Sequence, residues 1–349
     1  MIVTFPRRRC PGRRGFRSLA QEQTASLTRS IGAGMPPWIR SFVLLSDMAR
    51  FAVREIRCKS AINRVQGMPF AWSINPYRGC RHACVYCYAR PTHEYLGLGA
   101  GDEFQEVILA KVNAPEVVRL ELGRRGWRKE NVVIGTATDP YQQAESQYRL
   151  TRGILQAFRD FRNPVSITTK SPMIERDLDI LTDLVGHASV TVCLSITTLD
   201  ESIWRKVEPT TSKPSKRLAT LRRLSGLGIN AGVLLCPVLP GITDRSDQME
   251  AVVAAAAEHG ARFLSTRVLR LGKGIGDYYL PFVEREFPGL RRSYADLYRG
   301  DYAPEYYVQT IRARVDDLRQ RYGLSADRTD PAFAVSPHPP RQLDLFAAA

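Results

Sequence analysis

Short apolar runs alternate with amphipathic stretches along most of the chain. Runs of about four to eight apolar or β-branched residues predict buried strands, and the longer amphipathic stretches between them predict helices. The predicted strands span residues 71–75, 132–136, 165–169, 189–196, 230–236 and 262–268. The predicted helices span residues 114–125, 150–161, 174–185, 215–227 and 244–259. Strands separated in this way pair in parallel through right-handed crossovers.

Six such units predict an α/β protein with a partial (β/α)6 TIM-like barrel and a C-terminal helical extension. After Gly276 the pattern changes to helical sequence that is rich in aromatic residues. These aromatic residues are Tyr278, Tyr279, Phe282, Phe287, Tyr294, Tyr298, Tyr302, Tyr306 and Tyr307. They either pack a helical cap against the barrel or, beside neighbouring arginines, stack on nucleic-acid bases.

Composition divides the chain into four predicted parts. Residues 1–45 form a disordered basic extension, residues 46–276 the barrel, residues 277–325 the aromatic-rich cap, and residues 326–349 a flexible tail. The net charge is +15. Residues 1–45 hold eight arginines against one acid, Glu22, so this extension carries +7 and the remaining chain +8. The chain outside the extension is therefore only mildly basic, which fits a nucleic-acid partner without demanding one.

Three of the seven cysteines, Cys80, Cys84 and Cys87, lie within eight residues. Disulfides are disfavoured because three is an odd number and nothing else marks the chain as secreted. A zinc site needs a fourth ligand, which His82 or His93 could supply. Three thiolates without a fourth suit a [4Fe–4S] cluster that leaves one iron open.

The spacing Cys-x3-Cys-x2-Cys, with Tyr86 before the last cysteine, is similar to the signature of the radical S-adenosylmethionine (SAM) enzymes. The flanking residues 75–80 and 87–91 resemble a branch of spore-photoproduct-lyase-like proteins that are described as DNA repair photolyases. The likeness runs from about residue 59 to about residue 282. The motif is specific for the superfamily and less specific for the branch.

This resemblance implies the chemistry of the cysteine motif. The thiolates of Cys80, Cys84 and Cys87 are expected to hold three irons, and the amino and carboxylate groups of SAM the fourth. Electron transfer from the cluster then cleaves SAM reductively to a 5′-deoxyadenosyl radical. An electron donor such as a flavodoxin or a ferredoxin is therefore an expected partner.

The resemblance also implies two aromatic contacts to SAM. Tyr86 is expected to lie against the adenine, and Tyr88 near the SAM site. For both side chains the alternative is a buried tyrosine that packs in the core.

Further SAM contacts are implied at strand ends, where a β/α barrel carries its functional groups. Thr138 and Asp139 match positions near the SAM amino group, with a turn before Pro140 as the alternative. Lys170 and Ser195 match positions that contact the SAM carboxylate and ribose. A lysine at a strand end is expected to face a carboxylate, because a buried cation needs a partner. The alternative for Lys170 is a surface lysine.

One position departs from the lyase pattern. The lyases carry a hydrogen-donating cysteine where this chain has Thr136. A threonine hydroxyl holds its hydrogen too strongly to quench a carbon radical. The resemblance therefore does not predict repair of spore photoproduct by that route.

The tail ends in a short peptide that follows a proline-rich linker. Gln342, Leu343, Leu345 and Phe346 resemble the pentapeptide by which bacterial repair and replication proteins bind the DNA polymerase sliding clamp. Apolar anchors on a flexible segment suit binding to a groove. The sequence therefore predicts a clamp-binding tail.

The favoured hypothesis is a cytoplasmic radical SAM enzyme that acts on nucleic acid in DNA repair or processing. The alternatives are a radical SAM enzyme that modifies RNA, a peptide or a cofactor, and a non-enzymatic zinc-binding adaptor for nucleic acid or the clamp. No membrane association is expected, because no apolar run reaches the roughly 18 residues of a spanning helix.

Overall fold

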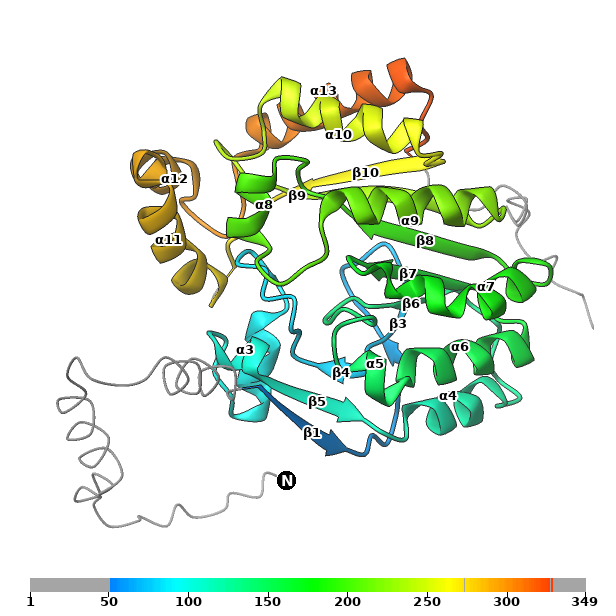
Figure 1. Ribbon diagram of the computed structural model, residues 1–349. Helices are drawn as coiled ribbons and strands as arrows, with labels where there is room; N and C mark the ends of the chain where they lie inside the picture. The colour runs from blue at the N-terminus through cyan, green and yellow to red at the C-terminus, as the bar shows by residue number, and fades with distance from the viewer. Residues whose placement is uncertain (1–50, 273, 327, 329–349) are drawn as a thin grey trace, which may run out of the picture. The chain divides into compact units, whose positions relative to one another are not determined.

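The computed structural model describes residues 51–272, 274–326 and 328 (Figure 1). The predicted N-terminal extension and the predicted clamp-binding residues Gln342, Leu343, Leu345 and Phe346 lie outside the described residues. Those expectations therefore stay predictions.

The predicted partial barrel is confirmed by a seven-stranded sheet. Its strand order is β10-β9-β8-β7-β6-β3-β2, and every neighbouring pair is parallel except β2 with β3. The strands are β2 (Asn63–Arg64), β3 (Trp72–Ile74), β6 (Val132–Ile134), β7 (Val165–Thr169), β8 (Val190–Ser195), β9 (Asn230–Val238) and β10 (Phe263–Val268). Six parallel strands in sequence order give the expected open barrel.

Helices cover the outer face of this sheet and form the main core with it. Figure 1 shows them beside successive strands, from α4 at the bottom to α10 at the top. They are α4 (Ala114–Leu122), α6 (Leu150–Phe161), α7 (Leu178–Val185), α9 (Pro214–Gly226) and α10 (Ser246–Glu258). One row of paired residues across five strands illustrates this core. All of its side chains are fully buried: Ile74, Ile134, Ile167, Val192 and Ala231.

The inner face of the sheet carries smaller and more polar side chains. One residue earlier in the same register, the aligned positions are Ser73, Val133, Ser166, Thr191 and Asn230. The inside of a closed (β/α)8 barrel is normally filled by bulky branched residues. Two of these side chains bond to the segment that lies over the inner face: Asn230 donates to the Thr191 hydroxyl at 3.1 Å, and both donate to the Arg328 carbonyl.

A second sheet of three strands was not predicted. Its order is β1-β5-β4, with β1 (Ala52–Ile56) parallel and β4 (Tyr77–Arg78) antiparallel to β5 (Val107–Lys111). The two-residue β4 is too short to leave a periodic pattern in the sequence. Because β4 lies just before the cysteine motif, its pairing with β5 fixes the direction in which the chain enters that loop.

Several short helical segments were also not predicted. They are α3 (Glu103–Glu106), α5 (Glu145–Tyr148), α8 (Glu201–Val207), and the 3-10 turns η2 (Arg90–Leu96) and η4 (Pro288–Leu290). The helix predicted over residues 174–185 begins as the 3-10 turn η3 (Pro172–Asp177) and becomes α-helical only at α7.

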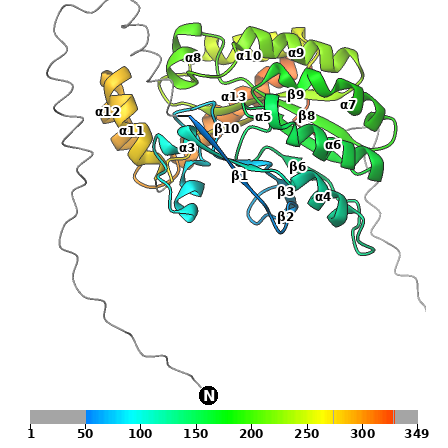
Figure 2. The same ribbon diagram turned by 60° about the horizontal axis from the view of Figure 1, so that its bottom comes forward.

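The C-terminal helical extension is confirmed and has two parts. In Figures 1 and 2, α11 (Ile275–Glu286) and α12 (Arg291–Leu297) lie together, apart from the barrel helices. The third helix, α13 (Glu305–Tyr322), returns to pack against α10 and β10. Among the described residues, no helix combines the length and apolar character needed to cross a membrane.

Candidate active site

The cysteine loop begins at a glycine that no other residue could replace without strain. Gly79 has a φ of +76°. A Cβ atom added there would lie 2.7 Å from the carbonyl oxygen of Phe104 and 2.8 Å from that of Val107. The next residue, Cys80, donates its backbone N–H to the same Phe104 carbonyl at 3.0 Å. The tight contact between loop and α3 therefore sets where the first thiol lies.

All three thiols of the loop are free, with Cys80 and Cys84 buried and Cys87 half-buried. Burial raises the pKa of Cys80 well above its ordinary value, and the charges of Asp139, Cys87 and Cys84 raise it further. Burial also raises the pKa of Cys84, to about 12, although Lys170 opposes this shift. Neighbouring buried thiolates repel one another, so a bound cationic iron centre is what would stabilise them. The donor set fits an iron–sulfur cluster.

Two residues after β6 brace this loop through hydrogen bonds. Thr138 donates its hydroxyl to the Gly79 carbonyl at 2.6 Å. The Gln142 amide donates to the same carbonyl at 3.1 Å and accepts the backbone N–H of Arg81 at 2.9 Å. Gln142 also donates to the Thr138 hydroxyl at 2.9 Å. Sequence reasoning singled out Thr138 but missed Gln142, which holds the loop on both sides of Cys80.

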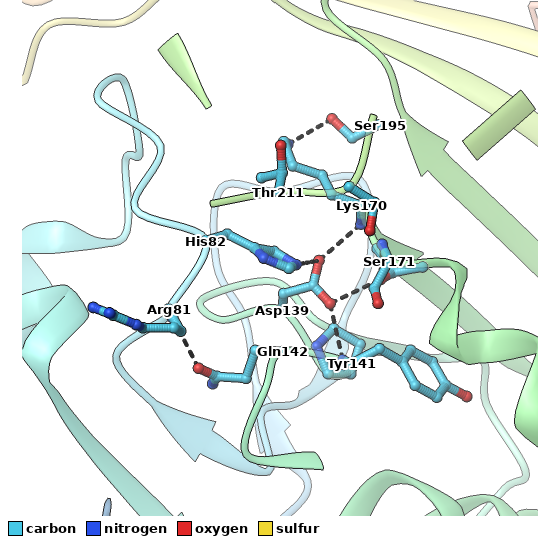
Figure 3. Close-up of polar contacts among 12 residues, drawn as sticks. Arg81, His82, Asp139, Tyr141, Gln142, Lys170, Ser171, Ser195 and Thr211 are labelled. Carbon is cyan, nitrogen blue, oxygen red and sulfur yellow. Dashed lines mark hydrogen bonds and ion pairs between the residues drawn. The ribbon is translucent and has the colours of Figure 1, made fainter. Parts of the chain in front are cut away.

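Asp139 joins the cysteine loop to the end of β7, as Figure 3 shows. One carboxylate oxygen accepts from the Thr169 hydroxyl at 2.7 Å and from the backbone N–H of Tyr141 at 2.9 Å. The other accepts the backbone N–H of Lys170 at 2.8 Å and lies 3.1 Å from His82 Nε2. Burial alone would raise the pKa of Asp139, but His82 and these hydrogen bonds lower it to about 2.

A fully buried arginine supports the middle of the loop. Arg90 donates through Nε and Nη2 to the Cys84 carbonyl, at 3.2 and 3.1 Å. It also donates to the Gly101 carbonyl at 2.8 Å and to the Gln105 side chain at 3.0 Å. Its guanidinium lies 3.7 Å from the ring centre of Tyr278 in α11. Arg90 was not singled out from the sequence.

Lys170 and Ser195 meet at the ends of adjacent strands β7 and β8. The Lys170 ammonium donates to the Ser195 hydroxyl at 2.8 Å and lies 5.7 Å from the ring centre of Tyr86. Ser195 in turn donates to the Cys236 carbonyl at 3.3 Å. Burial opposes the charged form of Lys170, but the charge of Glu208 raises its pKa. The structure thus brings Tyr86, Lys170 and Ser195 together.

Glu208 lies at the centre of this group and is fully buried. It accepts hydrogen bonds from the Tyr86 hydroxyl, from Thr197 at 2.9 Å and from Arg217 at 2.5 Å. The Lys170 ammonium lies 4.0 Å away. Burial alone would raise the pKa of Glu208, but Arg217 and then Lys170 lower it. The Glu208 carboxylate therefore connects the cysteine loop with α9 and with the segments that follow β7 and β8.

Sequence reasoning missed both Glu208 and Arg217, although one signal was present. Arg217 shares a helix face with Thr220, Leu221 and Leu224, and all four are buried. An arginine on the apolar face of a helix requires an acidic partner. The sequence could therefore have predicted a buried ion pair but not the identity of its partner.

Tyr88 lies apart from the Tyr86 group. It is 55% exposed and donates its hydroxyl to the Thr136 carbonyl. The Thr136 hydroxyl accepts from the Asn75 side chain at 3.0 Å. Tyr88 is thus in contact with Thr136, the position at which the sequence resemblance would place the hydrogen-donating cysteine of the lyases.

The two histidines considered as zinc ligands, His82 and His93, use Nε2 for contacts with other groups of the protein. His82 Nε2 lies against Asp139, and His93 Nε2 is 3.0 Å from the Val107 carbonyl. Within the described part of the chain, no three His, Cys, Asp or Glu side chains are grouped to hold a single metal ion. A [4Fe–4S] cluster spreads its cysteines over separate irons, so its ligands need not converge as zinc ligands do.

The chain belongs to the radical SAM superfamily, whose family model matches residues 74–256, more than half of the sequence. It is therefore a radical SAM enzyme, and this family uses a [4Fe–4S] cluster together with SAM. Uncharacterized proteins of Mycobacterium bovis and Mycobacterium tuberculosis are each 37% identical to it over 297 residues, which cover 84% of this chain and 87% of the relative.

Two solved structures share the fold. A variant of spore photoproduct lyase matches with a TM-score of 0.60 and 15% identity, over 87% of this chain and 92% of that chain. Another variant, with bound AdoMet (SAM) and dinucleoside spore photoproduct, matches with a TM-score of 0.58 and 15% identity, over 86% and 90% of the two chains. The predicted resemblance is confirmed at the level of superfamily and fold.

Proposed function

We propose that Cys80, Cys84 and Cys87 hold a [4Fe–4S] cluster, and that the enzyme acts on nucleic acid in DNA repair or processing. One observation carries the cluster assignment: three free thiols lie in a single braced loop, and the Lys170 ammonium lies 5.7 Å from the ring centre of Tyr86 in that loop. In this family the bound cluster supplies the electron for reductive cleavage of SAM to a 5′-deoxyadenosyl radical.

Lys170 has the properties of a carboxylate-binding residue. An ammonium group has three N–H donors, and among the described residues the only hydrogen bond of this ammonium is to Ser195. Its remaining donors suit the SAM carboxylate, and Ser195 beside it suits the ribose. The ring of Tyr86, held through its hydroxyl by Glu208, suits packing against the adenine.

Thr138, Asp139 and Tyr88 complete the proposed SAM site. The side-chain oxygens of Thr138 and Asp139 already bond within the protein, which favours a positioning role near the SAM amino group. Tyr88 is exposed enough to contact a ligand that enters over Thr136. We assign these three residues to the border of the site.

Charge supports a nucleic-acid substrate. The net charge of +15, of which +8 lies outside residues 1–45, suits a polyanion. Because Thr136 cannot quench a carbon radical, we propose a lesion or modification other than spore photoproduct as the target.

The expected partners also belong to this proposal. A flavodoxin or a ferredoxin would supply single electrons to the cluster, and a reducing cytoplasm suits free cysteines and a reduced cluster. The peptide that contains Gln342, Leu343, Leu345 and Phe346 would bring the enzyme to the DNA polymerase sliding clamp.

Anaerobic reconstitution tests the cluster assignment. We expect iron–sulfur absorption and production of 5′-deoxyadenosine from SAM in the presence of a reductant. Cys84→Ala should abolish both, whereas Cys193→Ala should not, because Cys193 is a buried cysteine within β8. Stoichiometric zinc in place of iron would overturn the proposal.

Deuterium transfer tests the substrate class. Deuterated nucleic-acid fragments are incubated with the reconstituted enzyme and SAM. Deuterium in 5′-deoxyadenosine would identify the fragment from which hydrogen is abstracted. Transfer only from a peptide or a small cofactor would refute the nucleic-acid assignment and leave the cluster assignment intact.

A further inference from the structure

Two tyrosines near the barrel rim are exposed in a hollow of about 460 Å³. We call this feature the aromatic hollow. Its lining residues are Asp296, Leu297, Arg299, Gly300, Tyr302, Pro304 and Tyr306. Tyr302 is 65% exposed and Tyr306 is 69% exposed. Exposed large aromatic side chains that share one concave surface are characteristic of binding sites.

Other aromatic residues of this segment are used in packing. The rings of Tyr294 and Tyr298 stack at 5.8 Å with an interplanar angle of 13°. The Tyr294 hydroxyl bonds to that of Tyr279 at 3.0 Å, and Tyr298 donates to the Leu269 carbonyl at 2.8 Å. These contacts hold the segment before Tyr302 in place. Binding of a ligand to Tyr302 therefore costs little conformational entropy.

The aromatic hollow lies at the rim that carries the candidate active site. Arg270 forms an antiparallel bridge with Tyr302, and the backbone N–H of Leu271 donates to the Asp301 carbonyl at 2.8 Å. Arg270 comes two residues after β10 ends at Val268. Because the barrel strands are parallel, this is the same end of the sheet at which Lys170 follows β7.

Arg299 is the charge of the hollow that suits an anionic ligand. The two acids nearby already have cationic partners: Asp296 in the lining lies 3.9 Å from Arg292, and Asp301 lies 3.1 Å from Arg270. The Arg270 guanidinium lies 4.8 Å from the ring centre of Tyr302. Arg299 is exposed, and within the described part of the chain it forms no ion pair. Arginines beside exposed aromatic faces are the combination that single-stranded nucleic acids require, because the bases stack while the phosphates are neutralised.

We propose that the aromatic hollow binds an unpaired stretch of nucleic acid, with bases stacked on Tyr302 and Tyr306 and phosphates near Arg299. Paired bases cannot reach these ring faces, so the ligand is single-stranded or locally opened. The inference rests on the proposed function and deepens it. It adds a second contact region for the substrate on the rim of the barrel.

Fluorescence anisotropy tests the proposal on the reconstituted full chain. The probe is a fluorescein-labelled oligodeoxythymidine of about 12 nucleotides. We expect Tyr302→Ala and Tyr306→Ala each to weaken binding about tenfold. Tyr302→Phe retains the ring and should restore binding. The matched control is Tyr95→Ala, because Tyr95 is 88% exposed in η2 and does not line the hollow.

Three further readouts separate the outcomes. SAM cleavage without nucleic acid should be unchanged in the Tyr302→Ala/Tyr306→Ala variant. Arg299→Ala should reduce the slope of log affinity against log salt concentration by about one. Inorganic polyphosphate should bind the wild type and the double variant equally, because it has no base that could stack. If the double variant loses affinity for polyphosphate as much as for the oligonucleotide, the inference is overturned.

The failure of this inference differs from a failure of the proposed function. If the wild type and the double variant bind the oligonucleotide equally, the aromatic hollow is not the site, although the nucleic-acid assignment stands. If the wild type cleaves SAM but binds no oligonucleotide of any sequence, the nucleic-acid assignment fails, and the inference fails with it.

Discussion

Arg217 and Glu208 form an ion pair at 2.5 Å in which neither side chain is exposed to solvent. The pair joins α9 to the segment that follows α8, and Glu208 also accepts the Tyr86 hydroxyl from the cysteine loop. Burying two charges is costly, and the attraction between them offsets that cost only while both are present. This pair therefore links the stability of the fold to the position of Tyr86.

The Glu208–Arg217 pair should show strong coupling in a double-mutant cycle. Glu208→Gln and Arg217→Met should each lower the free energy of unfolding by about 3–5 kcal/mol, because each leaves an uncompensated buried charge. The double variant should lose less than the sum of the two losses. Urea unfolding of the three variants measures the coupling. The control is the exposed pair Arg205–Glu201, which should couple by less than about 1 kcal/mol.

Gly79→Ala should disrupt the cysteine loop. The added Cβ would meet two backbone carbonyls, which cannot move as a flexible side chain can, and the positive φ adds strain. We expect a loss of more than about 3 kcal/mol in unfolding free energy, together with low iron and sulfide content. Gly97→Ala is the matched control, because Gly97 has a φ of +71° and open space around it. It should cost only about 1 kcal/mol.

Asp139 should make stability depend on pH in the acid range. Its pKa is lowered on folding to about 2, so the ionised carboxylate stabilises the fold at all pH values above its ordinary pKa near 4. That contribution, about 2 kcal/mol, should be lost as the pH falls from about 5 to 2. Urea unfolding of cluster-free protein across this range measures it. Asp139→Asn should be less stable at neutral pH and should lack this part of the acid dependence.

Lys170→Met should weaken SAM binding without unfolding the protein. A charge-assisted hydrogen bond contributes roughly 1.5–3 kcal/mol, so the dissociation constant should rise about 10- to 100-fold. Equilibrium dialysis with the reconstituted protein gives the value. Lys111→Met is the control, because Lys111 is a buried lysine that lies on β5 in the second sheet. Unchanged SAM affinity in Lys170→Met would remove this residue from the proposed site.

The tail should bind the sliding clamp through its apolar anchors. A peptide that contains the last 20 or so residues should retain purified clamp in a pull-down, because Leu345 and Phe346 fit an apolar groove. Phe346→Ala should abolish retention. Equal retention by both peptides would show that the pentapeptide does not carry the interaction.

Much of the fold was predictable because its signals are local. The alternation of short apolar runs and helical stretches predicted the six parallel strands, and the spacing of Cys80, Cys84 and Cys87 predicted the family. The small sheet was missed because β4 has only two residues, and because it pairs antiparallel with β5 across the cysteine loop, outside the repeated strand–helix pattern. A strand of that length has no period to detect.

The sequence by itself determined the class of enzyme, the barrel and the cysteine motif, since each is encoded within a few neighbouring residues or in a repeated period. Only the tertiary structure decided which side chains hold that motif in place. Tyr86 and Glu208 are 122 residues apart in the chain, and Arg81 and Gln142 are 61 apart. Such pairs depend on how the parallel strands align at one rim, and no local pattern records that alignment.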